Sequence, residues 1–183
     1  MLDGRPWVWD TSPLLHAARA ERLDVVAFLA GQRSSDHRTT SVVRSELDRG
    51  GVLGEVLRLG WPVSEGDRED SEWLARVAEW EVPLGVRGLH NLGEATCFAL
   101  ATSIDGVVVV DDKAAARAAE KRGLAKIGLL GVLDDAERLG HQTMTQAVAV
   151  VHALAETDGR YPRDAVADFP AWCRLRRRKL HLT

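Results

Sequence analysis

Four consecutive valines, Val107 to Val110, constrain the fold of this chain more than any other segment. Such an unbroken apolar run is typical of a strand that is buried on both faces of a parallel sheet. The run ends at Asp111 and Asp112, and the sequence KAAARAAEKR that follows predicts a helix ending at Gly123. A buried strand followed directly by a helix is the basic unit of an α/β protein.

The same order of strand and helix occurs at both ends of this segment. The apolar stretch Pro6 to Trp9 stops at Asp10, and Thr11-Ser12-Pro13 is a good start for a helix. Downstream, AKIG followed by LLGVLDDAERLG predicts another strand and helix. The alternation therefore predicts a doubly wound α/β domain with a central parallel sheet, in which ligands bind at the carboxyl ends of the strands.

The remaining segments predict mostly helices. We expect helical segments over 14–30, with a possible break near Arg22 to Asp24, a polar connection over 32–40, and a helix over 71–80 with two tryptophans on its apolar stripe. After Gly140 the pattern is helical only. We therefore predict an α/β domain over 1–140 and a helical C-terminal extension over 141–183 that packs on the same domain.

Four widely separated acidic positions carry the functional prediction: Asp10, Glu46, Glu94, and the pair Asp111 and Asp112. Three of the four lie where a strand or loop gives way to a helix, which is where an α/β sheet builds its sites. Converging carboxylates repel one another away from solvent, and a divalent cation removes that cost. Hard oxygen ligands suit Mg²⁺ or Mn²⁺, so the sequence favours a metal-dependent phosphodiester enzyme.

Each acid also has a structural explanation. Asp10 and Asp112 are suited to capping helices, which is worth about 1 kcal/mol each. Glu94 falls in a first helical turn, where the helix dipole favours a carboxylate by roughly 0.3–1 kcal/mol. Glu46 can be a solvated helix residue beside an arginine. Both explanations stay open for each residue at this stage.

Composition bounds the class of protein. The net charge is −3, so binding of a nucleic acid would need a local basic surface rather than the charge of the whole molecule. Cys97 and Cys173 are far apart and outside any CxxC pattern, which argues against a disulfide scaffold or a structural zinc site. No apolar stretch approaches 18 residues and no secretory leader is visible, so we expect a cytoplasmic protein without a membrane partner.

Two groups of cations are candidates for contacts to RNA phosphates. Lys113 and Arg117 share a face of the helix after Asp112, and Arg176 and Arg177 belong to a compact basic run near the C-terminus. Phosphate contacts of this kind would make binding salt-dependent. The alternative for the basic run is a solvated or frayed terminus.

Several segments, taken in order, resemble PIN-domain proteins, the nuclease fold used by VapC-type toxins of bacterial toxin–antitoxin pairs. The resemblance runs over about residues 5–140, through WVWDTSPLL, TTSVVRSEL and GEATCFALATSIDGVVVVDDKAAARAAEKRGLAKIGLLGVLDDAERLG. It implies a PIN-like three-layer α/β/α sandwich. It also implies an RNA substrate, a small antitoxin partner, and a homodimer whose contacts involve helices such as 13–30 and 71–80, of which the second is the expected exposed interface.

The resemblance also implies roles for the acids. Asp10, Glu46, Glu94 and Asp112 match the catalytic acids of the family, with Asp111 a close second to Asp112. Asp10, Glu94 and Asp112 would hold one or two Mg²⁺ or Mn²⁺ ions that activate a water for hydrolysis of an RNA phosphodiester bond, and Glu46 would orient that water.

The chain departs from the family's pattern at Val110, where a hydroxyl residue is usual, and Ser12 is a possible substitute for that hydroxyl. The alternative to a ribonuclease is a PIN-fold RNA-binding or regulatory protein that has weak or no catalytic activity.

Overall fold

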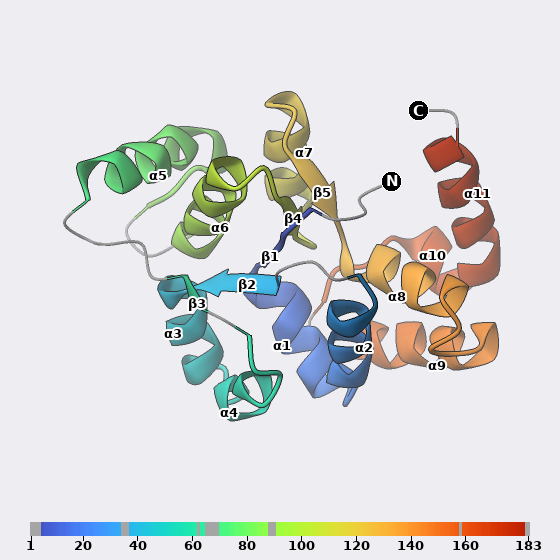
Figure 1. The fold of residues 1–183 in the computed structure, drawn as a ribbon. Helices are drawn as coiled ribbons and strands as arrows, with labels where there is room; N and C mark the ends of the chain where they lie inside the picture. Colours follow the sequence, from blue (N-terminus) through green and yellow to red (C-terminus); the bar gives the residue numbers. More distant parts are fainter. Residues whose placement is uncertain are drawn as a thin grey trace.

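A five-stranded parallel sheet forms the centre of the protein (Figure 1). The computed structural model describes residues 5–33, 37–61, 63–64, 70–87, 91–157 and 159–181. The strand order is β3-β2-β1-β4-β5, and every neighbouring pair is parallel. The strands are β1 (Trp7–Trp9), β2 (His37–Thr40), β3 (Val63–Ser64), β4 (Val107–Val109) and β5 (Ala125–Ile127).

Helices follow or precede each of these strands. They are α1 (Thr11–Arg19), α2 (Leu23–Arg33), α3 (Ser41–Arg49), α4 (Leu53–Leu57), α5 (Ser71–Leu84), α6 (Leu92–Ser103), α7 (Lys113–Lys121), α8 (Leu129–Arg138), α9 (Met144–Ala155), α10 (Arg163–Ala167) and α11 (Phe169–His181). In the described part of the chain, no helix is long and apolar enough to cross a membrane.

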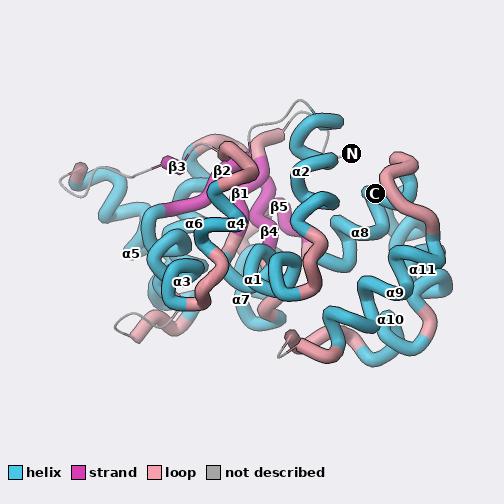
Figure 2. The backbone as a smooth tube through the Cα atoms, turned by 90° about the horizontal axis from the view of Figure 1, so that it is seen from below, coloured by secondary structure: helices cyan, strands magenta, loops and turns pink. Residues whose placement is uncertain are grey.

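The helices cover both faces of the sheet. Helices α5, α6 and α7 lie on one side, with α6 packed across β1, β2 and β4, and α1 to α4 lie on the other side (Figure 1). Helices α9 to α11 gather beside α8 at the opposite end of the molecule from α5 (Figure 2). This arrangement confirms the expected three-layer α/β/α sandwich with a central parallel sheet.

The central strands form the core. Trp7, Val8 and Trp9 of β1 and Val107–Val109 of β4 are fully buried and pair in register. A strand with helices on both faces needs apolar side chains at every position rather than at alternate ones. The valine run is therefore a strand buried on both faces of a parallel sheet, as its sequence predicts.

Strand β2 was missed because its sequence, HRTT, is polar. We expected residues 32–40 to form a polar connection, whereas His37–Thr40 is a parallel neighbour of β1. The polar atoms are accommodated by hydrogen bonds: the indole of Trp9 donates to His37 Nδ1 at 3.0 Å, and Thr39 Oγ1 donates to the Trp9 carbonyl at 2.9 Å. Burial of polar side chains costs little when each finds such a partner.

Part of the apolar stripe on α5, which we expected to be an exposed interface, is buried in the core. Trp80 is only 3% exposed and packs edge-on against Phe98, and Val77 is also buried. The exposed apolar side chains of this helix are Leu74 and Val82. The expectation that both tryptophans form an exposed interface patch is therefore wrong for Trp80.

Candidate functional site

The carboxyl ends of β1 and β4 place two of the predicted acids at one edge of the sheet. Asp10 directly follows β1, and its backbone amide donates to the carbonyl of Val109 in β4 at 3.1 Å. Asp111 lies two residues beyond that carbonyl. Since parallel strands end at the same edge, the topology brings two residues from distant parts of the sequence into one region.

Asp10 is buried in an environment that disfavours its charge. The side chain is 1% exposed, its Oδ1 has no hydrogen-bond partner, and it makes no capping hydrogen bond to α1. The backbone amides of Thr11 and Ser12 lie near enough to lower its pKa, but burial outweighs them. The pKa of Asp10 is raised well above its usual range, chiefly by burial and next by the charge of Glu94. Helix capping therefore does not explain this residue.

Three of the four predicted acidic positions share one electrostatic environment. Glu94, in the first turn of α6, and Glu46, in α3, both raise the pKa of Asp10 through their negative charge. The buried thiol of Cys97 feels the same group, because burial first and then Asp10, Glu94 and Glu46 raise its pKa. We call Asp10, Glu46 and Glu94 the carboxylate cluster.

Glu46 is held in place by a hydroxyl and by a glycine. The hydroxyl of Thr11 donates a short hydrogen bond to Glu46 Oε2. A Cβ atom at Gly93 would lie 2.7 Å from the same oxygen, so any larger residue there would force the Glu46 carboxylate to move. Glu46 is thus not simply a solvated helix residue.

A hydroxyl pair joins the two elements beneath the carboxylate cluster. The hydroxyls of Thr40, which caps α3, and Thr96, in α6, lie 2.9 Å apart and are buried. Thr96 Oγ1 in turn donates to the carbonyl of Gly93 at 2.8 Å. These contacts fix the start of α3 against the start of α6, and therefore the spacing between Glu46 and Glu94.

Asp112 has the structural role that we left open. It is exposed at the N-cap of α7 and accepts a hydrogen bond from the amide of Ala115 at 2.8 Å. That bond uses one carboxylate oxygen, and a carboxylate has a second oxygen with further acceptor capacity. Asp112 is not among the charges that raise the pKa of Asp10.

Asp111 is the more buried member of the pair. Its Oδ1 accepts a hydrogen bond from the backbone amide of Leu129 at 2.7 Å and therefore caps the start of α8. The same oxygen would lie 3.1 Å from a Cβ atom at Gly128. Its Oδ2 is buried and has no hydrogen-bond partner. Burial raises the pKa of Asp111 to about 6, although the Leu129 amide and the nearby Tyr161 phenol lower it.

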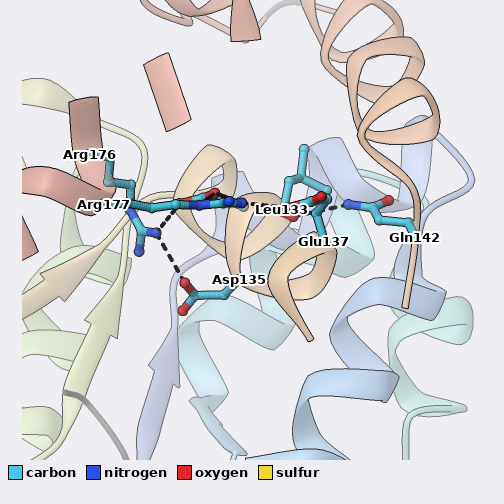
Figure 3. A network of polar contacts seen from close by, with 7 residues as sticks. Leu133, Asp135, Glu137, Gln142, Arg176 and Arg177 are labelled. Atoms are coloured by element: carbon cyan, nitrogen blue, oxygen red, sulfur yellow. Dashed lines mark hydrogen bonds and ion pairs between the residues drawn. The ribbon is translucent and has the colours of Figure 1, made fainter. Parts of the chain in front are cut away.

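The four predicted RNA-contacting cations divide into two groups. Lys113 is exposed and lines a cavity of about 430 Å³ that also borders Ser12 and Asp112. Arg117 is exposed on α7. By contrast, Arg176 and Arg177 point toward the acids of α8 (Figure 3).

Arg176 and Arg177 form ion pairs with the acids of α8. Arg176 lies 2.5 Å from Asp134 and 3.0 Å from Asp135, and Arg177 lies 2.6 Å from Asp134 and 2.5 Å from Glu137. These ion pairs give the two arginines a structural role, because they hold α11 on α8, and a contact of either arginine to RNA stays a prediction. A basic run in sequence cannot show which members face an acidic helix.

The carboxylate cluster fits a divalent cation in its chemistry, although its side chains are not arranged as a finished ligand set. Among the residues that the structure describes, no three His, Cys, Asp or Glu side chains are placed so that they could hold one ion. The unpartnered Asp10 Oδ1 and the mutual repulsion of the cluster are nevertheless features that a hard cation would relieve.

Sequence reasoning missed three residues near this edge. Thr11 was treated only as part of a helix start, and Arg160 and Tyr161 as part of an unremarked loop. Tyr161 is the only tyrosine in the chain, and its hydroxyl is buried near Asp111, whose pKa it lowers. Nothing local in the sequence indicates that residues 159–162 return to the end of β4.

Comparison with known proteins agrees with this geometry. The fold and its acidic edge define an α/β protein with carboxylates at the ends of parallel strands. The family model described as "PIN domain" matches residues 6–170, and the chain belongs to this family, whose members are generally nucleases. The match continues through α9 and α10, so these helices lie within the family's own span.

The chain is also similar to a solved structure. The chain is similar to VapBC2 from Rickettsia felis bound to a DNA fragment from its promoter, with a TM-score of 0.47 and 10% identity over 67% of this chain and 97% of that one. None of the curated proteins matches the chain.

Proposed function

We propose that this protein is a metal-dependent endoribonuclease that hydrolyses RNA phosphodiester bonds, and that its site is the carboxylate cluster with the two aspartates after β4. The observation that carries the proposal is the burial of Asp10 beside two further acids, with no hydrogen bond to its Oδ1. A protein that needed only a stable fold would gain by replacing such a residue.

The cation expected at this site is Mg²⁺ or Mn²⁺. Asp10 and Glu94 would hold it, with Asp112 or Asp111 as the ligand from the end of β4. A bound cation of this kind supplies a more acidic water and positive charge beside the leaving oxygen.

The chain's own residues would prepare the site for that chemistry. Thr11 fixes the Glu46 carboxylate, so that Glu46 can accept a proton from an attacking water in a defined direction. Lys113, exposed beside the cavity that borders Asp112, can hold a phosphate of the substrate. Arg117 can extend this contact along the same face of α7.

The PIN family also supports a proposal about partners. We expect a small antitoxin protein that covers the site, and a homodimer. The exposed Leu74 and Val82 of α5 are the apolar side chains on that helix available for such a contact. A cytoplasmic location is the expected setting for a protein that acts on cellular RNA.

Cleavage of RNA by the purified protein tests the proposal. A mixed pool of tRNA and mRNA is incubated with Mg²⁺, Mn²⁺ or EDTA, with Asp10→Asn and the exposed control Asp48→Asn beside the wild type. We expect discrete fragments that require metal, persist in Asp48→Asn and disappear in Asp10→Asn. Equal cleavage by wild type and Asp10→Asn would show that the carboxylate cluster is the wrong site.

The alternative is a PIN-fold RNA-binding or regulatory protein without hydrolysis, and Val110 is the observation that favours it, because the strand end lacks the usual hydroxyl. Metal-independent RNA binding without any cleavage, at every metal concentration tested, would support this alternative.

A further inference from the structure

Two cavities meet at the carboxyl end of β4. The first, of about 430 Å³, borders Ser12 and Asp112, and we call it the acid-side cavity. The second, of about 310 Å³, lies against Ile127 and Trp172, and we call it the C-terminal cavity. The two share four lining residues, namely Asp111, Lys113, Arg160 and Tyr161. The two cavities are therefore neighbours that border the same four side chains.

The C-terminal cavity combines apolar walls with a basic rim. Its walls include Ile127, at the end of β5, Leu130 of α8, and the half-buried indole of Trp172. Its lining also includes Lys126, which lies 3.8 Å from the exposed Glu120, and the exposed Arg160, while Lys113 lines both cavities. Apolar walls suit a flat, weakly solvated group, whereas the cations suit an attached anion.

Two buried polar atoms lie in the lining that the two cavities share, namely Asp111 Oδ2 and the hydroxyl of Tyr161. They lie close enough together for the Tyr161 phenol to lower the pKa of Asp111 as a hydrogen-bond donor. Carboxylate and phenol oxygens keep further acceptor capacity after one such contact. Donor groups on the edge of a ligand can therefore bind at this place.

The wall formed by α11 is held rigidly. Trp172 stacks on Phe169 with ring centroids 5.6 Å apart and an interplanar angle of 15°. One turn later, Arg176 is anchored to Asp134 and Asp135 on α8 (Figure 3). The indole is therefore presented to the cavity before any ligand arrives, which reduces the entropy lost on binding.

We propose that the C-terminal cavity is a nucleobase subsite, in which one base of a single-stranded RNA stacks on Trp172 while its flanking phosphate contacts Lys113, Lys126 and Arg160. This inference rests on the proposed ribonuclease function and adds a source of sequence selectivity to it. Unstacked RNA bases are recognised in this way, by stacking on aromatic rings and by hydrogen bonds to the base edge. The ends of β4 and β5 and the start of α8 form much of the subsite, and α11 adds Trp172 to it, so α11 takes part in substrate recognition.

Nucleotide binding in EDTA tests the subsite separately from cleavage. The four nucleoside 5′-monophosphates and short single-stranded RNA oligomers are titrated into wild type, Trp172→Phe, Trp172→Ala and the exposed control Arg163→Ala, with tryptophan fluorescence and calorimetry as readouts. We expect saturable binding with a preference among the four bases. Trp172→Ala should weaken it about 10-fold, because stacking on one base is worth 1–3 kcal/mol, while Trp172→Phe and Arg163→Ala stay near wild type in calorimetry.

If Trp172→Ala does not fold, a variant of the cations that line the cavity tests the same subsite. The double variant Lys126→Ala/Arg160→Ala changes two side chains at the cavity rim, and we expect it to weaken RNA binding and to reduce its salt dependence. In an active enzyme, Trp172→Ala and the rim variant should raise KM or change the cleaved sequence more than they lower kcat, whereas Trp172→Phe should keep the wild-type KM.

The outcomes separate the subsite from the nuclease. Absence of saturable nucleotide binding, or identical binding by folded Trp172→Ala, would overturn the subsite even if RNA is cleaved. Base-selective binding that depends on Trp172 would support the subsite even if no cleavage is found, in which case the nuclease proposal alone fails.

Discussion

At the scale of single residues, two acids lie where burial destabilises their charged forms. Asp10 and Asp111 both have raised pKa values because burial disfavours their charged forms. A carboxyl whose pKa is higher in the folded than in the unfolded state binds its proton more tightly when folded. Its contribution to stability is therefore complete below the unfolded pKa and is lost as the pH rises through the folded pKa.

Asp111 gives a testable consequence. Its pKa rises from an unfolded value near 4 to about 6, so the wild type should lose stability from this residue as the pH rises through that range. Asp111→Asn keeps an acceptor for the Leu129 amide and removes the buried charge. We expect the variant to be more stable than wild type by about 2–3 kcal/mol at pH 8 and to lack this pH dependence.

Urea unfolding between pH 4 and pH 8 in EDTA measures this difference. Asp112→Asn is the control, because Asn also caps helices well and the residue is exposed. It should follow the wild-type curve. A constant gap between wild type and Asp111→Asn at all pH values would contradict the assigned pKa.

At the scale of elements, the site depends on how closely α3 and α6 approach. Gly93 allows that approach because any Cβ atom there would strike the Glu46 carboxylate. Gly93→Ala should therefore displace Glu46 and reduce RNA cleavage by about 100-fold, the effect expected of a displacement near 1 Å. The matched control is Gly31→Ala, since a Cβ atom at Gly31 meets nothing within 4 Å. Equal cleavage by the two variants would show that Glu46 is not positioned by this contact.

A second contact between elements holds the C-terminal helices. Asp134 is fully buried between Arg176 and Arg177. Asp134→Ala leaves both guanidinium groups without their central partner and should lower the free energy of unfolding by about 3–5 kcal/mol. Arg178→Ala, exposed on the same helix, should change it by less than about 0.5 kcal/mol. Chemical denaturation measures the free energy of unfolding of both variants. If Asp134→Ala lowered it as little as Arg178→Ala does, the ion pairs would not contribute to stability.

At the scale of the whole molecule, the C-terminal helices complete the core. Ala147, Val151 and Leu154 of α9 are fully buried, and α9 contacts α1, α8, α10 and α11. A chain truncated after Gly140 should lose cooperative unfolding and bind a hydrophobic dye, because it exposes the apolar face of α8. A chain truncated after Arg178 keeps the α8–α11 ion pairs and should unfold cooperatively. Cooperative unfolding of the shorter chain would show that residues 1–140 fold alone.

The sequence predicted those elements whose burial in the fold follows from their own pattern of apolar and polar residues. The valine run, the helix after it, and the acids at strand ends were all visible, because apolar runs and Gly or Asp at boundaries report local structure. Strand β2 was invisible because its polar side chains bond to Trp9 of a distant strand. The same limit hid the roles of Tyr161 and Arg176, which depend on how residues 159–181 return to β4 and α8.

The carboxylate cluster as a cation site is the central claim, and the effect of Mn²⁺ on unfolding at pH 7.5 tests it most directly. In EDTA, Asp10→Asn should be more stable than wild type, because it removes a buried charge. At Mn²⁺ concentrations 100 times the dissociation constant, wild type should gain about 2.7 kcal/mol and Asp10→Asn much less, whereas Asp48→Asn should behave as wild type. An equal gain in wild type and Asp10→Asn, or none in either, would contradict a metal site at Asp10.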